Sequence, residues 1–142
     1  MTPRGIRLNN PMNLEYTGAD WKGLADPPSD SRFCRFVSPE YGIRAGCRVL
    51  LTYQDKYKLA LLSEFINRFA PPHENDTNAY AKFVAGFMGI TPHSQINVHD
   101  YRYLRPMAEA MIRMENGIMP YAPEVIDEGL AKAGVLPAPQ AA

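Results

Sequence analysis

Along most of the chain after residue 38, apolar residues recur every three or four positions, the spacing of helices that bury one face. Ser38 and Pro39 are typical of a helix start, and Asn75 or Asp76 is expected to cap a later helix. Glycines are expected to end the last three helices. The pattern predicts five helices, at residues 39–58, 62–69, 76–88, 101–116 and 123–133.

Two of these helices carry a more specific expectation. The predicted buried face of the third consists of Tyr80, Phe83, Val84 and Phe87. In the fourth, Pro106 lacks the backbone N–H of a regular helix, and we expect it to kink the helix or split it in two.

The first 37 residues differ from the rest, because closely spaced turn signals interrupt any helical pattern. Extended pieces at 13–16 and 32–37 predict a small antiparallel hairpin. The segment Asp-Pro-Pro-Ser-Asp at 26–30 is expected to be a turn. The predicted fold class is therefore α+β, mostly α-helical.

The length of 142 residues supports one hydrophobic core and not two. We expect a single domain at residues 1–134, made of a hairpin lobe (1–37) and a helical part (38–134). Residues 135–142 are rich in proline and alanine, have nothing to bury and are expected to form a flexible tail.

Composition and charge narrow the classes of function. Lys plus Arg and Asp plus Glu both number 15, so the formal net charge is zero and nucleic acid is not an expected partner. No apolar run approaches the ~20 residues of a membrane span, and the start lacks a signal peptide, which predicts synthesis in the cytoplasm.

Cys34 and Cys47 lie among apolar neighbours and are expected to be reduced core thiols. The histidines lack zinc-site spacing, so neither a metal nor another cofactor is expected.

Glu115 is the strongest candidate for a chemical role. Residues three and four apart share a helix face, so Glu115 lies on the apolar stripe that includes Met111 and Ile112. Removing a carboxyl group from water raises its pKa, and a glycosidase proton donor must stay protonated near neutral pH. The helix is expected to end at Gly117, where a cleft can open. The alternative is that Glu115 pairs with an arginine or caps a neighbouring backbone.

A polar loop at residues 70–77 separates two apolar helices. Its side chains, including Asn75, could contact sugar hydroxyls, and Glu74 or Asp76 could supply a second carboxylate. Tyr80 follows the loop on the next helix. The alternative is that Asn75 or Asp76 only caps the helix and that the rest is solvated.

Amide and aromatic side chains gather near the start of the chain, among them Asn10, Asn13 and the single tryptophan, Trp21. Sugar sites combine amide donors with aromatic faces, because a pyranose presents hydroxyls at its rim and C–H groups on its faces. Turn-forming asparagines and a core tryptophan explain the same residues without a ligand.

Several segments resemble a family of bacteriophage virion proteins that are described either as structural proteins or as lysozyme-like peptidoglycan hydrolases. The resemblance runs from about residue 4 to residue 134, and its motifs occur in the family's order. It implies a lysozyme-like fold, a location in the virion, and bacterial peptidoglycan and other virion proteins as partners. The matching segments are 4–14, 21–23, 33–44, 66–72, 74–77, 115–117 and 120–121, together with Tyr80.

The Asn-Asn-Pro-Met-Asn block at residues 9–13 also looks like the bacterial glucosaminidases of the lysozyme superfamily. In those proteins the catalytic glutamate lies in a Glu-Ser-Gly segment upstream of the block, whereas only eight residues precede Asn9 here and none is acidic. Residues 115–117, Glu-Asn-Gly, resemble that segment near the other terminus. The resemblance thus implies a circularly permuted glucosaminidase-like or transglycosylase-like domain with Glu115 as the general acid.

The implied function is cleavage of β-1,4 glycan bonds in peptidoglycan, by a lytic transglycosylase or by an enzyme of muramidase or glucosaminidase type. The expected catalytic residues are Glu115 and Glu74. The expected substrate-binding residues are Asn10, Asn13, Trp21, Asn75, Asp76, Tyr80 and Asn116.

Three positions depart from the family's pattern. Met12 stands where glycine is expected, Phe69 where tryptophan is expected and Met114 where histidine is expected. Met12 would be strained if its backbone required a positive φ. The departures favour an alternative, a non-catalytic structural virion protein of the tail, interior or surface. A further alternative is a glycan-binding module in which Glu115 is dispensable.

Overall fold

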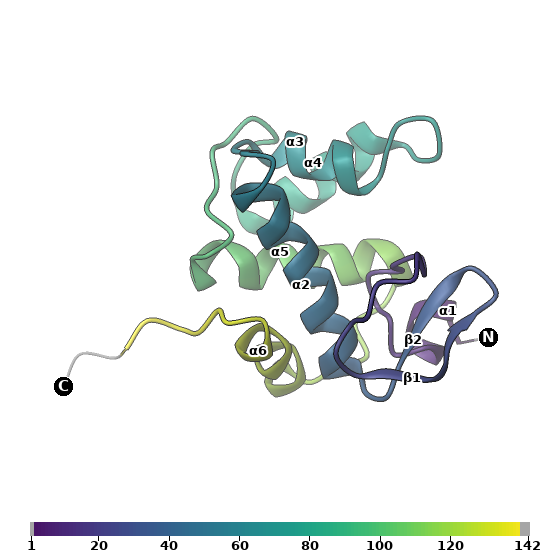
Figure 1. Ribbon diagram of the computed structural model, residues 1–142. Coiled ribbons are helices and arrows are strands. Elements are labelled where there is room, and N and C mark those ends of the chain that lie inside the picture. The colour runs from purple at the N-terminus through teal and green to yellow at the C-terminus, as the bar shows by residue number, and fades with distance from the viewer. Residues whose placement is uncertain (1, 140–142) are drawn as a thin grey trace.

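The computed structural model describes residues 2–139 and has an α+β fold, as predicted. A short helix and a two-stranded hairpin form a lobe beside one end of the long helix α2 (Figure 1). In chain order the elements are α1 (Arg4–Arg7), β1 (Leu24–Asp30), β2 (Phe33–Phe36), α2 (Pro39–Asp55), α3 (Leu62–Phe69), α4 (Thr77–Met88), α5 (Tyr101–Asn116) and α6 (Pro123–Lys132). Helices α5 and α6 contact α2, α4 packs against α5, and α3 packs against α4.

The five long helices lie where the apolar periodicity predicts them, within about three residues at each end. The Asp76 carboxylate accepts a hydrogen bond from the backbone N–H of Ala79 and so caps α4. Gly89 and Gly117 follow α4 and α5 with φ of 74° and 75°, a left-handed conformation that glycine adopts without strain. The short helix α1 was not predicted, because four residues are too few for a periodic pattern.

Pro106 does not split α5 in two, so that half of the prediction is wrong, whereas the alternative, a kink, stays a prediction. The helix runs from Tyr101 to Asn116 with the proline inside. Pro106 lies in the second turn, so the hydrogen bond it cannot donate would have gone to the carbonyl of Arg102, an exposed residue. Water can donate a hydrogen bond to that carbonyl. The free energy lost with the one missing backbone hydrogen bond is offset by the packing of the rest of the helix.

The predicted buried face of α4 is half wrong. Tyr80 and Val84 are buried, but Phe83 and Phe87 are 42% and 41% exposed. The helix is apolar on several sides, so periodicity alone does not define one stripe. Small residues turn out to face the core instead, namely Thr77, Ala81 and Ala85.

The hairpin lobe differs in part from the prediction. Strand β2 is confirmed, and the segment at 14–16 pairs with it through an antiparallel bridge between Glu15 and Phe33. The error concerns residues 26–30, which belong to β1 and not to a turn. Prolines are tolerated there because only one side of β1 pairs with β2, and the register is irregular between Leu24 and Ser29.

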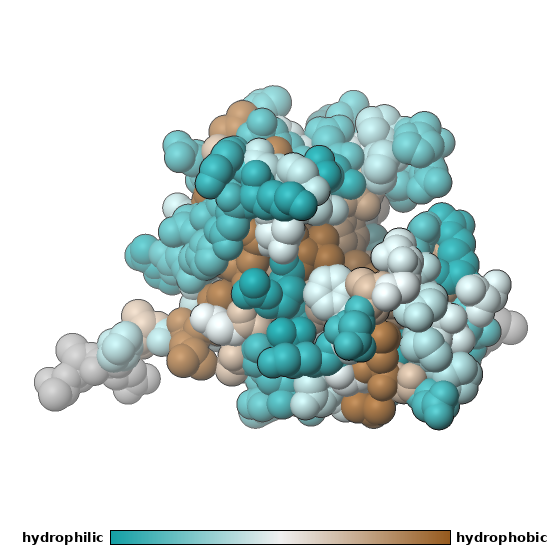
Figure 2. Space-filling model, viewed as in Figure 1, coloured by the Kyte–Doolittle hydropathy of each residue, from teal (hydrophilic) through white to brown (hydrophobic). Residues whose placement is uncertain are grey.

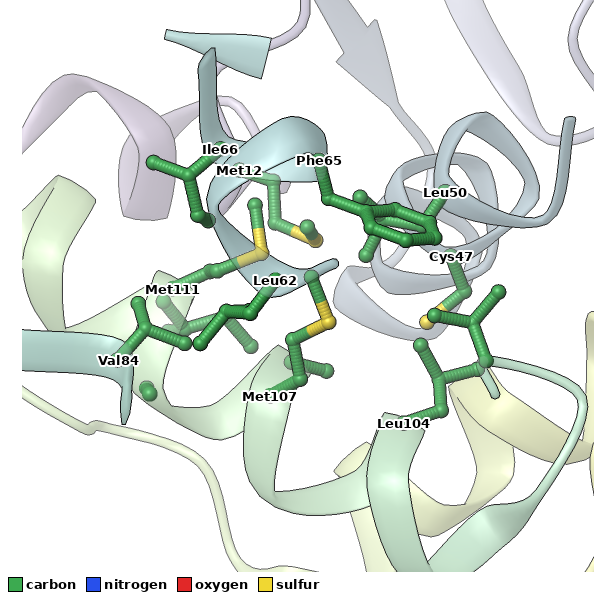
Figure 3. Close-up of a cluster of buried hydrophobic side chains, with 14 of the residues drawn as sticks. Met12, Cys47, Leu50, Leu62, Phe65, Ile66, Val84, Leu104, Met107 and Met111 are labelled. Atoms are coloured by element: carbon green, nitrogen blue, oxygen red, sulfur yellow. The ribbon is translucent and has the colours of Figure 1, made fainter. Parts of the chain in front are cut away.

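Met12 links the lobe to the main hydrophobic core. It is fully buried among residues of α2, α3, α4 and α5, and it points toward Met107 and Met111 (Figure 3). Its φ is not positive, so the side chain causes no backbone strain. Gly46 on α2 makes room for the Met12 sulfur, since a Cβ atom at residue 46 would clash with it. The methionine is therefore accommodated by a matching glycine.

The end of the described chain is only partly a tail. Val135, which was expected to be flexible, is 2% exposed and belongs to the core, whereas Leu136 is 65% exposed. Residues 140–142 of the predicted tail lie outside the described residues. Cys34 and Cys47 are buried and free, as predicted.

Across residues 2–139, no helix has the length and apolar character needed to cross a bilayer. The same residues hold no cluster of three or more His, Cys, Asp or Glu side chains that could bind a metal ion. Polar and charged residues cover much of one face of the molecule, with apolar residues visible between them (Figure 2).

Candidate active site

A cleft of about 790 Å³ lies between the hairpin lobe and the helical part. Residues from the lobe, from α2 and α3, from the loop before α4 and from the end of α5 line it. No single element builds the cleft, so it depends on the way the lobe packs against the helices. Its lining includes Arg4, Met12, Asn13, Leu14, Glu15, Thr17, Trp21, Arg32, Phe33, Val49, Tyr53, Arg68, Phe69, Ala70, Pro71, Glu74, Asn75 and Glu115.

Glu115 lies in the last turn of α5 and lines this cleft. Both of its carboxyl oxygens accept hydrogen bonds. The side-chain amide of Asn13 donates to Oε1 at 2.8 Å, and the hydroxyl of Tyr80 donates to Oε2 at 2.8 Å. Two donors from different elements therefore fix the carboxyl group in position, while free lone pairs on the oxygens can still face a ligand.

The backbone and the surroundings explain why Asn13 and Tyr80 can do this. Asn13 has a φ of 55°, a left-handed conformation in which asparagine is tolerated better than most residues. Tyr80 is buried on α4. Burial, followed by the nearby charge of Glu115 and its hydrogen bond, raises the pKa of Tyr80 well above its ordinary value. The phenol therefore stays protonated and remains a donor.

Glu74, the second predicted catalytic residue, lies in the cleft but has a different environment from Glu115. Its side chain is 53% exposed and lies 3.9 Å from the guanidinium of Arg32. The same guanidinium forms an ion pair with Glu15. One arginine of the lobe thus interacts with two of the three carboxylates that line the cleft, and leaves Glu115 to Asn13 and Tyr80.

Trp21 and Asn75 also line the cleft, as does Asn13. The aromatic residues Phe33, Tyr53 and Phe69 join them and were missed by the sequence analysis. Nothing in their spacing distinguishes them from core residues, because they come from three separate elements. The cleft wall therefore mixes aromatic faces with amide and charged groups.

Four predicted substrate-binding residues do not line the cleft. Tyr80 is buried and donates to Glu115, and the structure gives each of the other three, Asn10, Asp76 and Asn116, a contact with the backbone. Asn10 is fully buried and its amide donates to the carbonyls of Leu14 and Cys34, which shapes the lobe. Asn116 is 9% exposed and donates to the carbonyl of Pro11 at 2.7 Å, which ties the end of α5 to the segment before Asn13. Asp76 caps α4. The side chains of Asn10, Asp76 and Asn116 make hydrogen bonds with backbone groups, so in this structure they support the elements around the cleft and do not line it.

Comparison with known proteins supports the phage part of the expected resemblance. No protein-family model matches the chain. The chain is 42% identical over 129 residues to Protein P5 of Pseudoalteromonas phage PM2, a match that covers 89% of this chain and 79% of the relative. A phage relative is consistent with the expected virion location. Because the match is this close and spans most of both chains, the protein belongs to the family of Protein P5 of Pseudoalteromonas phage PM2.

Proposed function

We propose that this phage protein is a virion-associated enzyme that cleaves β-1,4 glycan bonds of bacterial peptidoglycan, with Glu115 as the general acid. One observation carries the proposal: a glutamate at a helix end lines a cleft and is held by two donors distant in sequence, Asn13 of the lobe and Tyr80 of α4. A proton donor must be held in a fixed orientation beside the leaving oxygen, and these two contacts supply that.

The charge arrangement favours a reaction with one working carboxyl group. Glu15 and Glu74 both interact with Arg32, which leaves Glu115 as the cleft carboxyl group that forms no ion pair within residues 2–139. In a lytic transglycosylase, Glu115 would donate its proton to the glycosidic oxygen as the bond from C1 breaks. A hydroxyl of the same sugar then bonds to C1, and its proton returns to Glu115. If Glu74 takes part after all, it would activate water for hydrolysis instead.

The circularly permuted lysozyme-like domain is part of this proposal. It requires Glu115 to face the side of the cleft that the N-terminal lobe forms. Asn13 and Phe33 of the lobe line the same cleft as Glu115, which supports the permutation.

The test is clearing of purified peptidoglycan sacculi by the full chain, by Glu115→Gln and by Glu128→Gln. Glu128 lies on α6, is exposed and makes one pair within its own helix, with Lys132, so its substitution controls for loss of a carboxylate. We expect clearing by the wild type and by Glu128→Gln. Glu115→Gln should remain folded and be at least a hundredfold slower, on the order of the general acid's contribution. Equal rates for wild type and Glu115→Gln would refute the catalytic role.

A second candidate is a structural virion protein that no longer cuts. A surface of α4 and α5 favours it: Phe83 and Phe87 are exposed with ring centroids 6.5 Å apart, and Arg113 lies over the Phe87 ring. Exposed aromatic residues of this kind are frequent at protein–protein contacts. Sacculi left intact by the wild type, under conditions where a control lysozyme digests them, would support this candidate.

A further inference from the structure

A second hollow of about 870 Å³ adjoins the cleft. The two are continuous, because five residues line both: Thr17, Trp21, Val49, Tyr53 and Arg68. Beyond these shared residues, the second hollow is bordered by the end of α2 and by the turn that follows it, which includes Lys56 and Tyr57. The candidate active site is therefore one part of a longer groove, which is suited to a ligand of several linked units.

Arg68 lies where the two hollows meet. Its guanidinium stacks on the ring of Tyr57 at 3.7 Å from the centroid and lies 5.3 Å from that of Tyr53. Lys56 adds a second positive charge, 5.4 Å from the Tyr57 ring centroid. Neither cation forms an ion pair within the part of the chain that the structure describes. The two tyrosines thus orient a guanidinium whose charged edge is free to bind an anion.

Charge is distributed unevenly along the groove. The first cleft is lined by the carboxylates of Glu15, Glu74 and Glu115 and by the guanidinium groups of Arg4 and Arg32, whereas the second hollow has Lys56 and no carboxylate among its lining residues. Arg32 pairs with Glu15 and Glu74, so a ligand with a negative charge on every unit, such as a polyphosphate, would meet the carboxylate of Glu115, which forms no ion pair among the described residues. A largely neutral glycan with a carboxylate on some of its units fits this pattern better, since the charged group can sit at Arg68 while neutral sugars lie near Glu115.

We propose that Arg68, stacked on Tyr53 and Tyr57, forms a subsite for a carboxylate carried by the glycan ligand. This proposal rests on the proposed function for its class of ligand. In peptidoglycan the carboxylate has two sources, the lactyl group of the sugar and the peptide attached to it. Arg68 would bind either by charge-assisted hydrogen bonds and so set the position of the strand relative to Glu115.

The test measures binding and not cleavage, in Glu115→Gln protein so that no ligand is consumed. Trp21 is the single tryptophan and lines both hollows, so its fluorescence reports occupancy of the groove. Three probes are titrated: a neutral chitooligosaccharide, glycan strands stripped of peptide that keep the lactyl carboxylate, and muropeptides that carry the peptide. The variants Arg68→Gln and Arg68→Lys are compared with Lys82→Gln, an exposed charge control on α4.

We expect at least one carboxylated probe to bind more tightly than the neutral one, and the tighter probe identifies the source of the carboxylate. Arg68→Gln should weaken that probe on the order of tenfold and leave the neutral probe unchanged. Arg68→Lys should keep part of the preference, and Lys82→Gln all of it. No preference in the parent protein, or an equal effect of Arg68→Gln on all probes, would overturn the subsite. Both results are independent of whether the wild type cleaves sacculi.

Arg4 provides a sharper comparison, because it stacks on Phe33 in the first cleft at 3.5 Å from the ring centroid. Arg4→Gln should not change the preference for the carboxylated probe. If Arg4→Gln abolishes the preference and Arg68→Gln does not, the carboxylate binds at the other arginine and the proposal is wrong.

Discussion

At the scale of single residues, the helix position of Glu115 could be predicted from its sequence neighbours, but its partners could not. The rule that residues three and four apart share a face places Glu115 beside Met111 and Ile112 at a helix end. Asn13 is 102 positions away in sequence and Tyr80 is 35 positions away. Such contacts arise from tertiary packing, and no local pattern indicates them.

The bond from Tyr80 to Glu115 can be tested with Tyr80→Phe. Loss of the hydroxyl removes one of the two donors that hold the carboxyl group, and we expect cleavage of sacculi to slow about tenfold or more. The fold should persist, since the phenyl ring still fills the same buried space on α4. The measurements are the initial rate of clearing and the urea midpoint.

Tyr121→Phe is the matched control. The hydroxyl of Tyr121 is buried without a hydrogen-bond partner among the described residues, and burial raises its pKa to about 12. Removing an unpaired buried hydroxyl should leave stability unchanged or raise it by about 1 kcal/mol, with no effect on cleavage. A rate loss in Tyr121→Phe equal to that in Tyr80→Phe would show that the Tyr80 effect is not specific to Glu115.

At the scale of elements, periodicity predicts where helices lie more reliably than which side they bury. The bounds of α3 are those predicted, because an apolar stripe ends at two prolines. In α4, which packs against α5 and α3, the small residues face the core and two phenylalanines do not. Strand β1 could not be predicted, because its prolines are typical of turns and only its edge position tolerates them.

The pairing of Met12 with Gly46 on α2 is predicted to be energetically coupled. Gly46→Ala should destabilise the protein, because its Cβ clashes with the Met12 sulfur. Met12→Ala should cost about 2 to 5 kcal/mol through the cavity it leaves. The double variant should lose less unfolding free energy than the two single variants lose together, since the new methyl group occupies part of the cavity. Strict additivity of the urea-unfolding free energies would contradict this contact.

We expect the carboxylate of Glu64, at the start of α3, to stabilise the fold to an extent that depends on pH. Its carboxylate accepts hydrogen bonds from the backbone N–H groups of Ala60 and Leu61, which lower its pKa below the ordinary 4.5. A lowered folded-state pKa gives stability that is present above the unfolded pKa and lost as the pH falls through the folded one. Glu64→Gln should therefore lower the urea midpoint at pH 7, and the difference should shrink below about pH 4. A constant difference across this range would exclude the carboxylate as its cause.

At the scale of the whole molecule, the fold class and the phage relationship could be predicted, whereas the groove could not. The α+β organisation follows from a change in pattern near residue 38, and the resemblance to phage proteins agrees with the close match to Protein P5. The groove exists because the lobe, α2, α3 and the end of α5 meet. Tyr53 of α2, Tyr57 of the turn after α2 and Arg68 of α3 line it together. No segment of sequence contains that information by itself.

The measurement to make is mass spectrometry of the material that the full chain releases from purified sacculi, with Glu115→Gln in parallel. The proposed function predicts soluble muropeptides from the wild type and none above background from the variant. Anhydro ends would identify a transglycosylase, and reducing ends a hydrolase. Release of the same muropeptides by folded Glu115→Gln, or none by the wild type where a control lysozyme releases them, would contradict the catalytic role of Glu115.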